Sequence, residues 1–140
     1  MAVQTPPPGM TIVASEHGPQ ETAARLVAAL TERGVTVISR VNHAAGAAGV
    51  GLSLLPTELI VFGNPLVGTP VMQAAQTAGI DLPLRALVWQ DEAGKTWIGY
   101  NDPDWIAERH GIETGLDATL GKMVQILAAV SRHAAGHDPG

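Results

Sequence analysis

Residues 84–100 read LRALVWQDEAGKTWIGY, and this stretch decides the fold class. Two apolar and aromatic runs flank a short polar segment at 91–95, whose Asp and Gly are typical of hairpin loops. A hairpin joins antiparallel strands, whereas parallel strands need a longer crossover connection. The stretch therefore predicts a sheet that is at least partly antiparallel.

Further strands are predicted on the N-terminal side of this hairpin. Residues 57–62, TELIVF, form the strongest candidate, and we expect this strand in the sheet centre with both faces buried. Residues 35–41 alternate in polarity, and residues 10–14 form a short β-branched run. Helical spacing of apolar residues follows Pro19 and Leu116, but helices and strands do not alternate regularly. We therefore predict an α+β fold with a mainly antiparallel sheet of about five strands and helices packed on one face.

The chain is expected to form a single domain over residues 10–134, with a flexible proline-rich lead-in at 1–9 and a disordered tail at 135–140. No signal peptide is predicted, and no apolar run approaches the ~20 residues that cross a bilayer. The interpretation is a cytoplasmic protein without a membrane partner. The absence of cysteine excludes disulfides and thiolate metal sites. With 13 acidic residues against 8 scattered basic ones, we expect no nucleic-acid partner.

The segment that follows the strongest strand, GNPLVGTP at 63–70, is the first candidate site. Its two glycines have P-loop spacing, but the lysine that would follow the second glycine is missing, so nucleotide hydrolysis is not indicated. Thr69 and Pro70 have the pattern of a helix N-cap and first helical residue. Free N–H groups at such a helix start could hold an anion. The alternative is a tight strand-to-helix connection that needs glycine for its geometry.

Two further candidates follow predicted strands. His43 enters a loop of small residues, where it could act as a general base or as a metal or haem ligand, or simply bond to backbone. No metal site is predicted, because no second histidine is suitably spaced. Asn101 and Asp102 precede a proline, and the three residues together are typical of a turn. The alternative is that Asn101 and Asp102 orient a ligand, or that Asp102 serves in acid–base catalysis.

Between residues 40 and 103 the chain carries an ordered set of motifs: RVNHAA at 40–45, VGL at 50–52, PTEL at 56–59, FGNP at 62–65, GTPVMQ at 68–73, IDLPL at 80–84, ALVW at 86–89 and YNDP at 100–103. In order and spacing this set resembles domain-of-unknown-function family 302, over about residues 9–134. The resemblance implies a compact α+β fold with a sheet similar to that of the TATA-binding protein, a homodimer, and no established activity. Leu66 departs from the lysine often found in relatives, which puts any anion contact there in doubt.

Three functional hypotheses remain open. The first is a dimeric module that binds a small, anionic ligand through His43, Asn64, Gly68, Thr69 and Asn101. The second is an enzyme with His43 and Asp102 as candidate catalytic groups, and the third is a structural or interaction domain. No cofactor is identified. The first hypothesis predicts that His43, Asn64 and Thr69 share a groove, which requires that the strands before His43 and Asn64 run parallel.

Overall fold

The computed structural model describes residues 5–137. Its sheet contains β1 (Met10–Ser15), β2 (Thr36–Asn42), β3 (Thr57–Gly63), β4 (Leu84–Gln90) and β5 (Thr96–Asn101). The strand order is β1-β5-β4-β3-β2, and every neighbouring pair is antiparallel. The predicted α+β class and the five-stranded antiparallel sheet are therefore confirmed.

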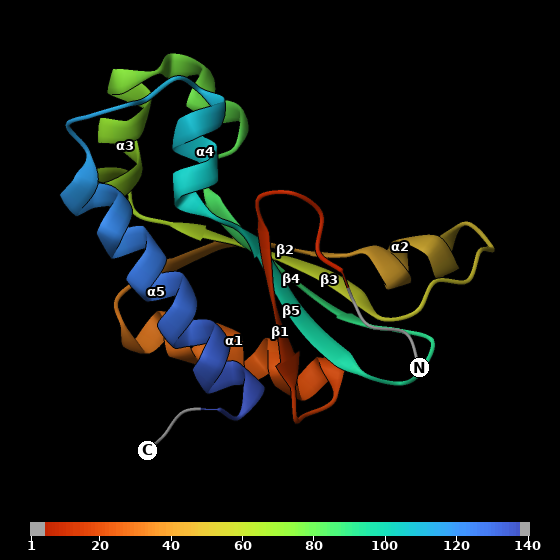
Figure 1. Ribbon diagram of the computed structural model, residues 1–140. Helices are drawn as coiled ribbons and strands as arrows, with labels where there is room; N and C mark the ends of the chain where they lie inside the picture. The colour runs from red at the N-terminus through yellow and green to blue at the C-terminus, as the bar shows by residue number, and fades with distance from the viewer. Residues whose placement is uncertain (1–4, 138–140) are drawn as a thin grey trace.

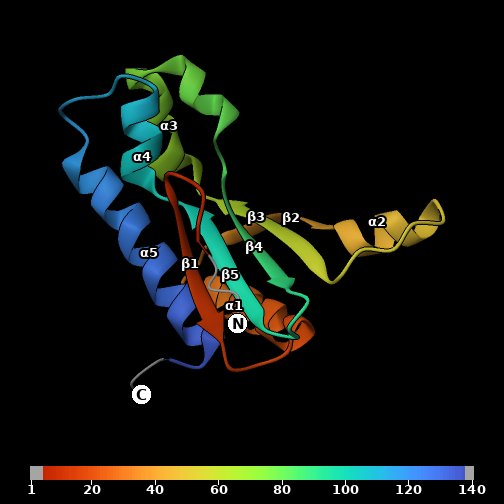
Figure 2. The same cartoon turned by 45° about the vertical axis from the view of Figure 1, so that its right-hand side comes forward.

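Two long helices cover one face of the sheet. The helical elements are α1 (Pro19–Glu32), α2 (His43–Gly49), α3 (Pro65–Ala74), the 3₁₀ helix η1 (Gln76–Ile80), α4 (Pro103–Arg109) and α5 (Asp117–Ala135). Helices α1 and α5 pack on each other and on the sheet, whereas α3, η1 and α4 gather beyond one end of the strands (Figure 1). Helix α2 projects away from the body, as the turned view also shows (Figure 2).

The hydrophobic core lies between the sheet and these two helices. From α1 it takes Leu26 and Leu30, and from α5 it takes Leu127 and Val130, all without solvent exposure. These residues recur at helical spacing, so one apolar stripe of each helix faces the sheet. At about 25 cal/mol per Å² of buried apolar surface, these contacts are the main stabilising contribution to the fold.

Strand β3 differs from the prediction. It lies next to the edge strand β2 rather than in the centre, and only one of its faces is fully covered. Ile60 and Phe62 are buried on the helix side, whereas Leu59 and Val61 alternate onto the opposite face and are half-buried. An apolar run fits a strand with two covered faces, but among residues 5–137 the helices α1 and α5 cover only one face of β3, and the other stays partly exposed.

The hairpin between β4 and β5 turns through 91–95 as predicted. The Asp91 carboxylate accepts hydrogen bonds from the backbone N–H groups of Ala93 and Lys95 and from the indole Nε1 of Trp97. These donors favour the ionised form, with the indole bond contributing most, and so lower the pKa of Asp91.

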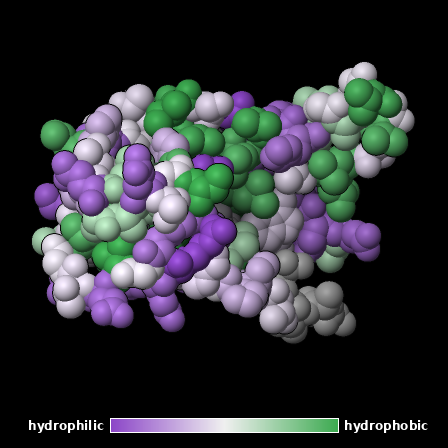
Figure 3. Space-filling view, turned by 90° about the horizontal axis from the view of Figure 1, so that it is seen from above, coloured by the Kyte–Doolittle hydropathy of each residue, from purple (hydrophilic) through white to green (hydrophobic). Residues whose placement is uncertain are grey.

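A projecting apolar arm forms between β2 and β3. It consists of α2, a turn at residues 50–51 and the irregular segment 52–55. Val50 is 74% exposed, Leu52 67% and Leu54 50%. In Figure 3 apolar side chains gather on this arm, apart from the main body. Exposed apolar side chains concentrated on one segment indicate an interaction surface.

The C-terminal helix continues to Ala135, further than expected, and His137 is placed by bonds from its backbone N–H to Arg132 and from its ring to the Ala14 carbonyl. The rest of the predicted tail, and residues 1–4 of the lead-in, lie outside the described residues.

Within residues 5–137, no helix combines the length and the apolar character needed to cross a bilayer.

Candidate functional site

The candidate site lies at the end of the sheet where β3 ends and β4 begins. Helix α3 starts here at Pro65, and Asn64 caps it by accepting a hydrogen bond from the Leu66 N–H at 2.9 Å. The predicted start at Thr69 and Pro70 is wrong, because Asn64 and Pro65 provide the same cap-and-proline signal five residues earlier. Thr69 therefore lies inside α3, and the N–H groups after it do not form a helix start for an anion.

A cavity of about 320 Å³ opens between α3 and the adjacent strand ends. Its lining comes from β2, the 63–72 segment, the 82–84 segment and α5: Ile38, Gly63, Asn64, Pro65, Val67, Gly68, Thr69, Met72, Leu82, Pro83, Leu84 and Met123. Most of these side chains are apolar, and Asn64 and Thr69 supply the polar side chains. The size and the lining are those of a small-molecule pocket.

The structure brings three of the predicted ligand-binding residues to this cavity. Asn64, Gly68 and Thr69 all line it. Gly68 is informative because a Cβ built on it meets no atom within 4 Å, so the helix leaves open space at this position.

His43 does not join them, and the predicted groove shared by His43 and Asn64 is wrong. Strands β2 and β3 are antiparallel, with Asn42 opposite Glu58 and Thr36 opposite Gly63. At about 3.4 Å per residue, the two sheet ends are roughly 20 Å apart. His43 begins α2 as an exposed residue at the far end, so it contributes nothing to the cavity.

Asn101 and Asp102 lie at the cavity end of the sheet but do not line the cavity. The Asp102 carboxylate accepts a hydrogen bond from the Thr11 hydroxyl at 2.6 Å, and its backbone N–H donates to the Gly9 carbonyl. Burial, with a smaller contribution from the Asp102 charge, raises the pKa of the neighbouring Tyr100. Through these two bonds Asp102 connects β1 and the segment before it to the start of α4.

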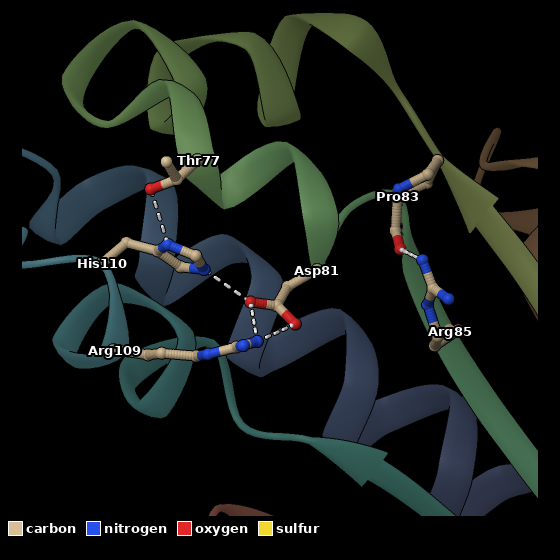
Figure 4. Close-up of polar contacts among 6 residues, drawn as sticks. All are labelled: Thr77, Asp81, Pro83, Arg85, Arg109 and His110. Carbon is tan, nitrogen blue, oxygen red and sulfur yellow. Dashed lines mark hydrogen bonds and ion pairs between the residues drawn. The ribbon is translucent and has the colours of Figure 1, made fainter.

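Arg85 is a charged group beside the cavity that sequence reasoning did not select. It follows Leu84 on β4 and is half-buried, and its Nε is buried without a hydrogen-bond partner. Its Nη2 donates to the carbonyl of the cavity-lining Pro83 at 3.5 Å, and no carboxylate within residues 5–137 pairs with it. Figure 4 shows this guanidinium directed along β4 toward Pro83.

A second polar cluster lies between η1 and α4, where Asp81 accepts hydrogen bonds from Arg109 at 2.8 and 2.9 Å and contacts His110 Nε2 at 2.5 Å (Figure 4). The other ring nitrogen of His110 lies 2.8 Å from the Thr77 hydroxyl. The order carboxylate, imidazole, hydroxyl resembles a catalytic relay, but these three groups do not line the cavity beside α3. We interpret the cluster as a structural one. Its bonds hold η1, and with it the cavity wall at Leu82 and Pro83, against the end of α4.

These residues form no metal centre. Within the described part of the chain, no three His, Asp or Glu side chains are grouped closely enough to hold an ion. His43 in particular has no acidic partner there that would make it a ligand or base with an orienting group.

A family model described as "Domain of unknown function DUF302" matches residues 11–130. The chain belongs to this family. The match bears out the resemblance identified from the ordered motifs. It also means that the cavity just described is a feature of a DUF302 domain, for which the family supplies no activity.

A solved structure supports the fold of this DUF302 chain. The crystal structure of an uncharacterised conserved DUF302 protein from Bacillus stearothermophilus superimposes with a TM-score of 0.80. The sequences are 22% identical, and the alignment covers 91% of this chain and 99% of that one. At this identity the likeness concerns the fold alone.

Curated relatives of the DUF302 chain are named for a channel activity. Over 128 residues it is 46% identical to proteins named "Fluoride-specific ion channel FluC 1" from Brucella suis and from Brucella abortus. The alignments cover 91% of this chain but only 50% and 47% of those proteins. The DUF302 chain thus spans about half the length of the curated relatives it matches.

Proposed function

We propose that this domain binds a small, largely apolar molecule in the cavity beside α3. The observation that carries the proposal is the cavity itself: about 320 Å³, with a mainly apolar lining and polar side chains at Asn64 and Thr69. Burial of apolar ligand surface would supply the affinity, and the polar groups would orient the ligand. An anion alone is not favoured here, because no cationic side chain lines the cavity.

The volume sets the ligand size. At about 30 Å³ per water-sized group, 320 Å³ holds roughly ten such groups, so a ten-carbon chain is a suitable probe. We therefore use 1-decanol as the uncharged probe. Isothermal titration should give saturable binding with a negative heat-capacity change, since apolar surface is buried.

Gly68 allows this cavity to be filled deliberately. Gly68 lines the cavity and a Cβ there meets no atom within 4 Å. The side chain of Gly68→Leu is therefore expected to occupy the cavity and abolish decanol binding while the protein remains folded. Gly121→Leu is the matched control, because Gly121 also lies in a helix with nothing within 4 Å of its Cβ position but does not line the cavity. Equal binding by both variants and the wild type, or no binding by the wild type, would contradict the proposal.

The name of the curated relatives suggests the setting in which the ligand is bound. Because the shared segment is about half of those proteins, the channel activity in their name is not assigned to this domain. We infer instead that the domain senses its ligand next to a fluoride channel, either in the same chain or as a separate protein. The test measures fluoride efflux from cells that produce a Brucella relative, with the cavity either intact or filled by the substitution equivalent to Gly68→Leu. Efflux that is the same for both proteins at all decanol concentrations would contradict the inference.

We also propose that the chain forms a homodimer through its uncovered sheet face. That face carries half-buried Leu59, Leu87, Trp89 and Trp97, and it lies opposite the face on which α1 and α5 pack. The arm with Val50, Leu52 and Leu54 emerges at the Trp89 end of this face. A second copy offers both an apolar arm and an apolar face, so a two-fold arrangement can cover each arm with the partner's sheet.

Leu52→Asp tests the dimer, since Leu52 is 67% exposed in a single chain. Sedimentation at tens of micromolar should show a dimer for the wild type and a shift toward the 14.5 kDa monomer for the variant. A wild-type monomer would refute the dimer.

A further inference from the structure

The pocket has a charged neighbour that the proposed function does not use. Arg85 lies on central strand β4, opposite Val61 on β3. Side chains alternate between faces, so Arg85 shares its face with Gly63, two residues beyond Val61. Gly63 lines the cavity, and the Pro83 side chain packs over it, 3.3 Å from where a Cβ on Gly63 would stand. Arg85 therefore lies behind Pro83, at the edge of the cavity and outside its lining.

The other arginines within residues 5–137 are engaged differently. Arg25, Arg40 and Arg109 each pair with a carboxylate, and Arg33 and Arg132 are exposed residues that donate to a carbonyl of their own helix. Arg85 combines a buried, unbonded Nε with a half-buried position on an apolar sheet face. A cation placed in such surroundings without a counter-ion is unfavourable unless an anion is supplied.

The direction of the side chain points to where that anion would lie. Arg85 Nη2 contacts the carbonyl of Pro83, which is itself part of the cavity wall. Asn101 follows Tyr100, which pairs with Ala86, so Asn101 lies beside Arg85 on the same face and adds an amide to this polar edge. An apolar pocket with a cation at its edge is complementary to an amphipathic anion.

We propose that the ligand is an amphipathic carboxylate or phosphate ester of about ten heavy atoms in its apolar part, with its head group bound by Arg85. This inference rests on the proposed function, because it assumes that the apolar part occupies the cavity. The planar guanidinium presents Nε and an Nη in one plane, which suits bidentate binding of a carboxylate or phosphate. Asn101 then has a role in head-group contact although it does not line the cavity.

The test compares decanoate, decyl phosphate and 1-decanol by isothermal titration, all below their micelle concentrations. The wild type should bind the two anions about tenfold more tightly than the alcohol, as expected for a charge-assisted hydrogen bond at a half-buried site. Whichever anion binds more tightly identifies the head-group class. In Arg85→Gln the anions should lose this tenfold advantage while decanol binding stays within about twofold of the wild type.

Arg85→Lys keeps the charge but loses the bidentate geometry, so it should retain part of the preference for anions. Arg33→Gln is the matched control: it removes an exposed arginine remote from the cavity and should leave all three affinities unchanged. Circular dichroism establishes that each variant is folded at the titration temperature. If Arg85→Gln proves unfolded, Arg85→Lys together with the salt dependence of the wild-type anion preference decides the point.

The outcomes separate the two proposals. Equal affinity for decanol and both anions in the wild type, unchanged by Arg85→Gln, would overturn the head-group inference and leave the apolar pocket intact. Failure of all three probes to bind would overturn the proposed function. A wild-type anion preference that survives in Arg85→Gln would place the head group elsewhere and would also overturn this inference.

Discussion

Removing the Asp81 carboxylate should destabilise the protein and loosen the cavity wall. Asp81 is 11% exposed in its side chain and binds His110, 7% exposed, and Arg109, 48% exposed. Asp81→Ala deprives the buried imidazole of its partner, which costs about 1–3 kcal/mol. The more exposed Arg109 pair adds at most about 1 kcal/mol because solvent screens it.

The expected loss is therefore about 2–3 kcal/mol. At roughly 3–4 °C per kcal/mol for a domain of this size, the melting temperature should fall by about 8 °C. Differential scanning calorimetry measures the fall, and hydrogen exchange should show faster exchange in α3 and η1 than in β4 and β5, because the bonds of Asp81 act locally. The matched control is Glu21→Ala, which breaks the exposed pair with Arg25 and should cost under about 1 kcal/mol.

A melting temperature that falls by less than about 2 °C, or an equal loss of hydrogen-exchange protection in all elements, would refute the role of Asp81 in holding η1 against α4. Weaker decanol binding by Asp81→Ala is expected as well, since Leu82 and Pro83 directly follow the residue and line the cavity.

Two other substitutions have defined outcomes. Hydrogen bonds from Trp97, Lys95 and Ala93 lower the pKa of Asp91 in the folded state. The stabilisation that Asp91 provides is therefore complete at pH values above the pKa of the unfolded chain, near about 3.9. It is lost as the pH falls through the lower pKa of the folded protein. The stability difference between the wild type and Asp91→Ala, from urea unfolding, should therefore shrink as the pH falls below about 4, and a constant difference would refute the linkage. His43→Ala should change neither the melting temperature nor decanol binding, because His43 is exposed at the far end of the sheet; loss of binding in titration would contradict the placement of the site.

Local sequence signals predicted most of the fold. The 91–95 loop determines the hairpin because Asp91 closes it by bonds within four residues. The helix before Gly34 was also recognisable, since its apolar spacing and glycine end are local features. By contrast, the pairing direction of β2 and β3 depends on the connection at 43–56, whose length permits either direction, and this is why His43 was placed at the wrong end.

The residues that sequence reasoning missed are those joined over long distances. Asp81 and His110 are 29 positions apart, and no periodic pattern links them. In the sequence Arg85 is an ordinary strand residue. Only the strand pairing shows that no carboxylate on a neighbouring strand pairs with it and that its Nε is left without a hydrogen-bond partner. The helix start was misplaced because two cap-and-proline signals compete within the seven residues 64–70, and only packing selects Asn64 and Pro65.

Methionine methyl signals offer the most direct test of the central claim that the cavity beside α3 binds an apolar molecule. Met72 and Met123 line the cavity, whereas Met10 lies on β1 and serves as an internal reference. In a titration of methyl-labelled protein with 1-decanol, followed by NMR, the Met72 and Met123 signals should shift together and saturate while Met10 stays unchanged, and Gly68→Leu should remove the shifts. Unmoved Met72 and Met123 signals at saturating decanol, or equal shifts at Met10, would contradict the account.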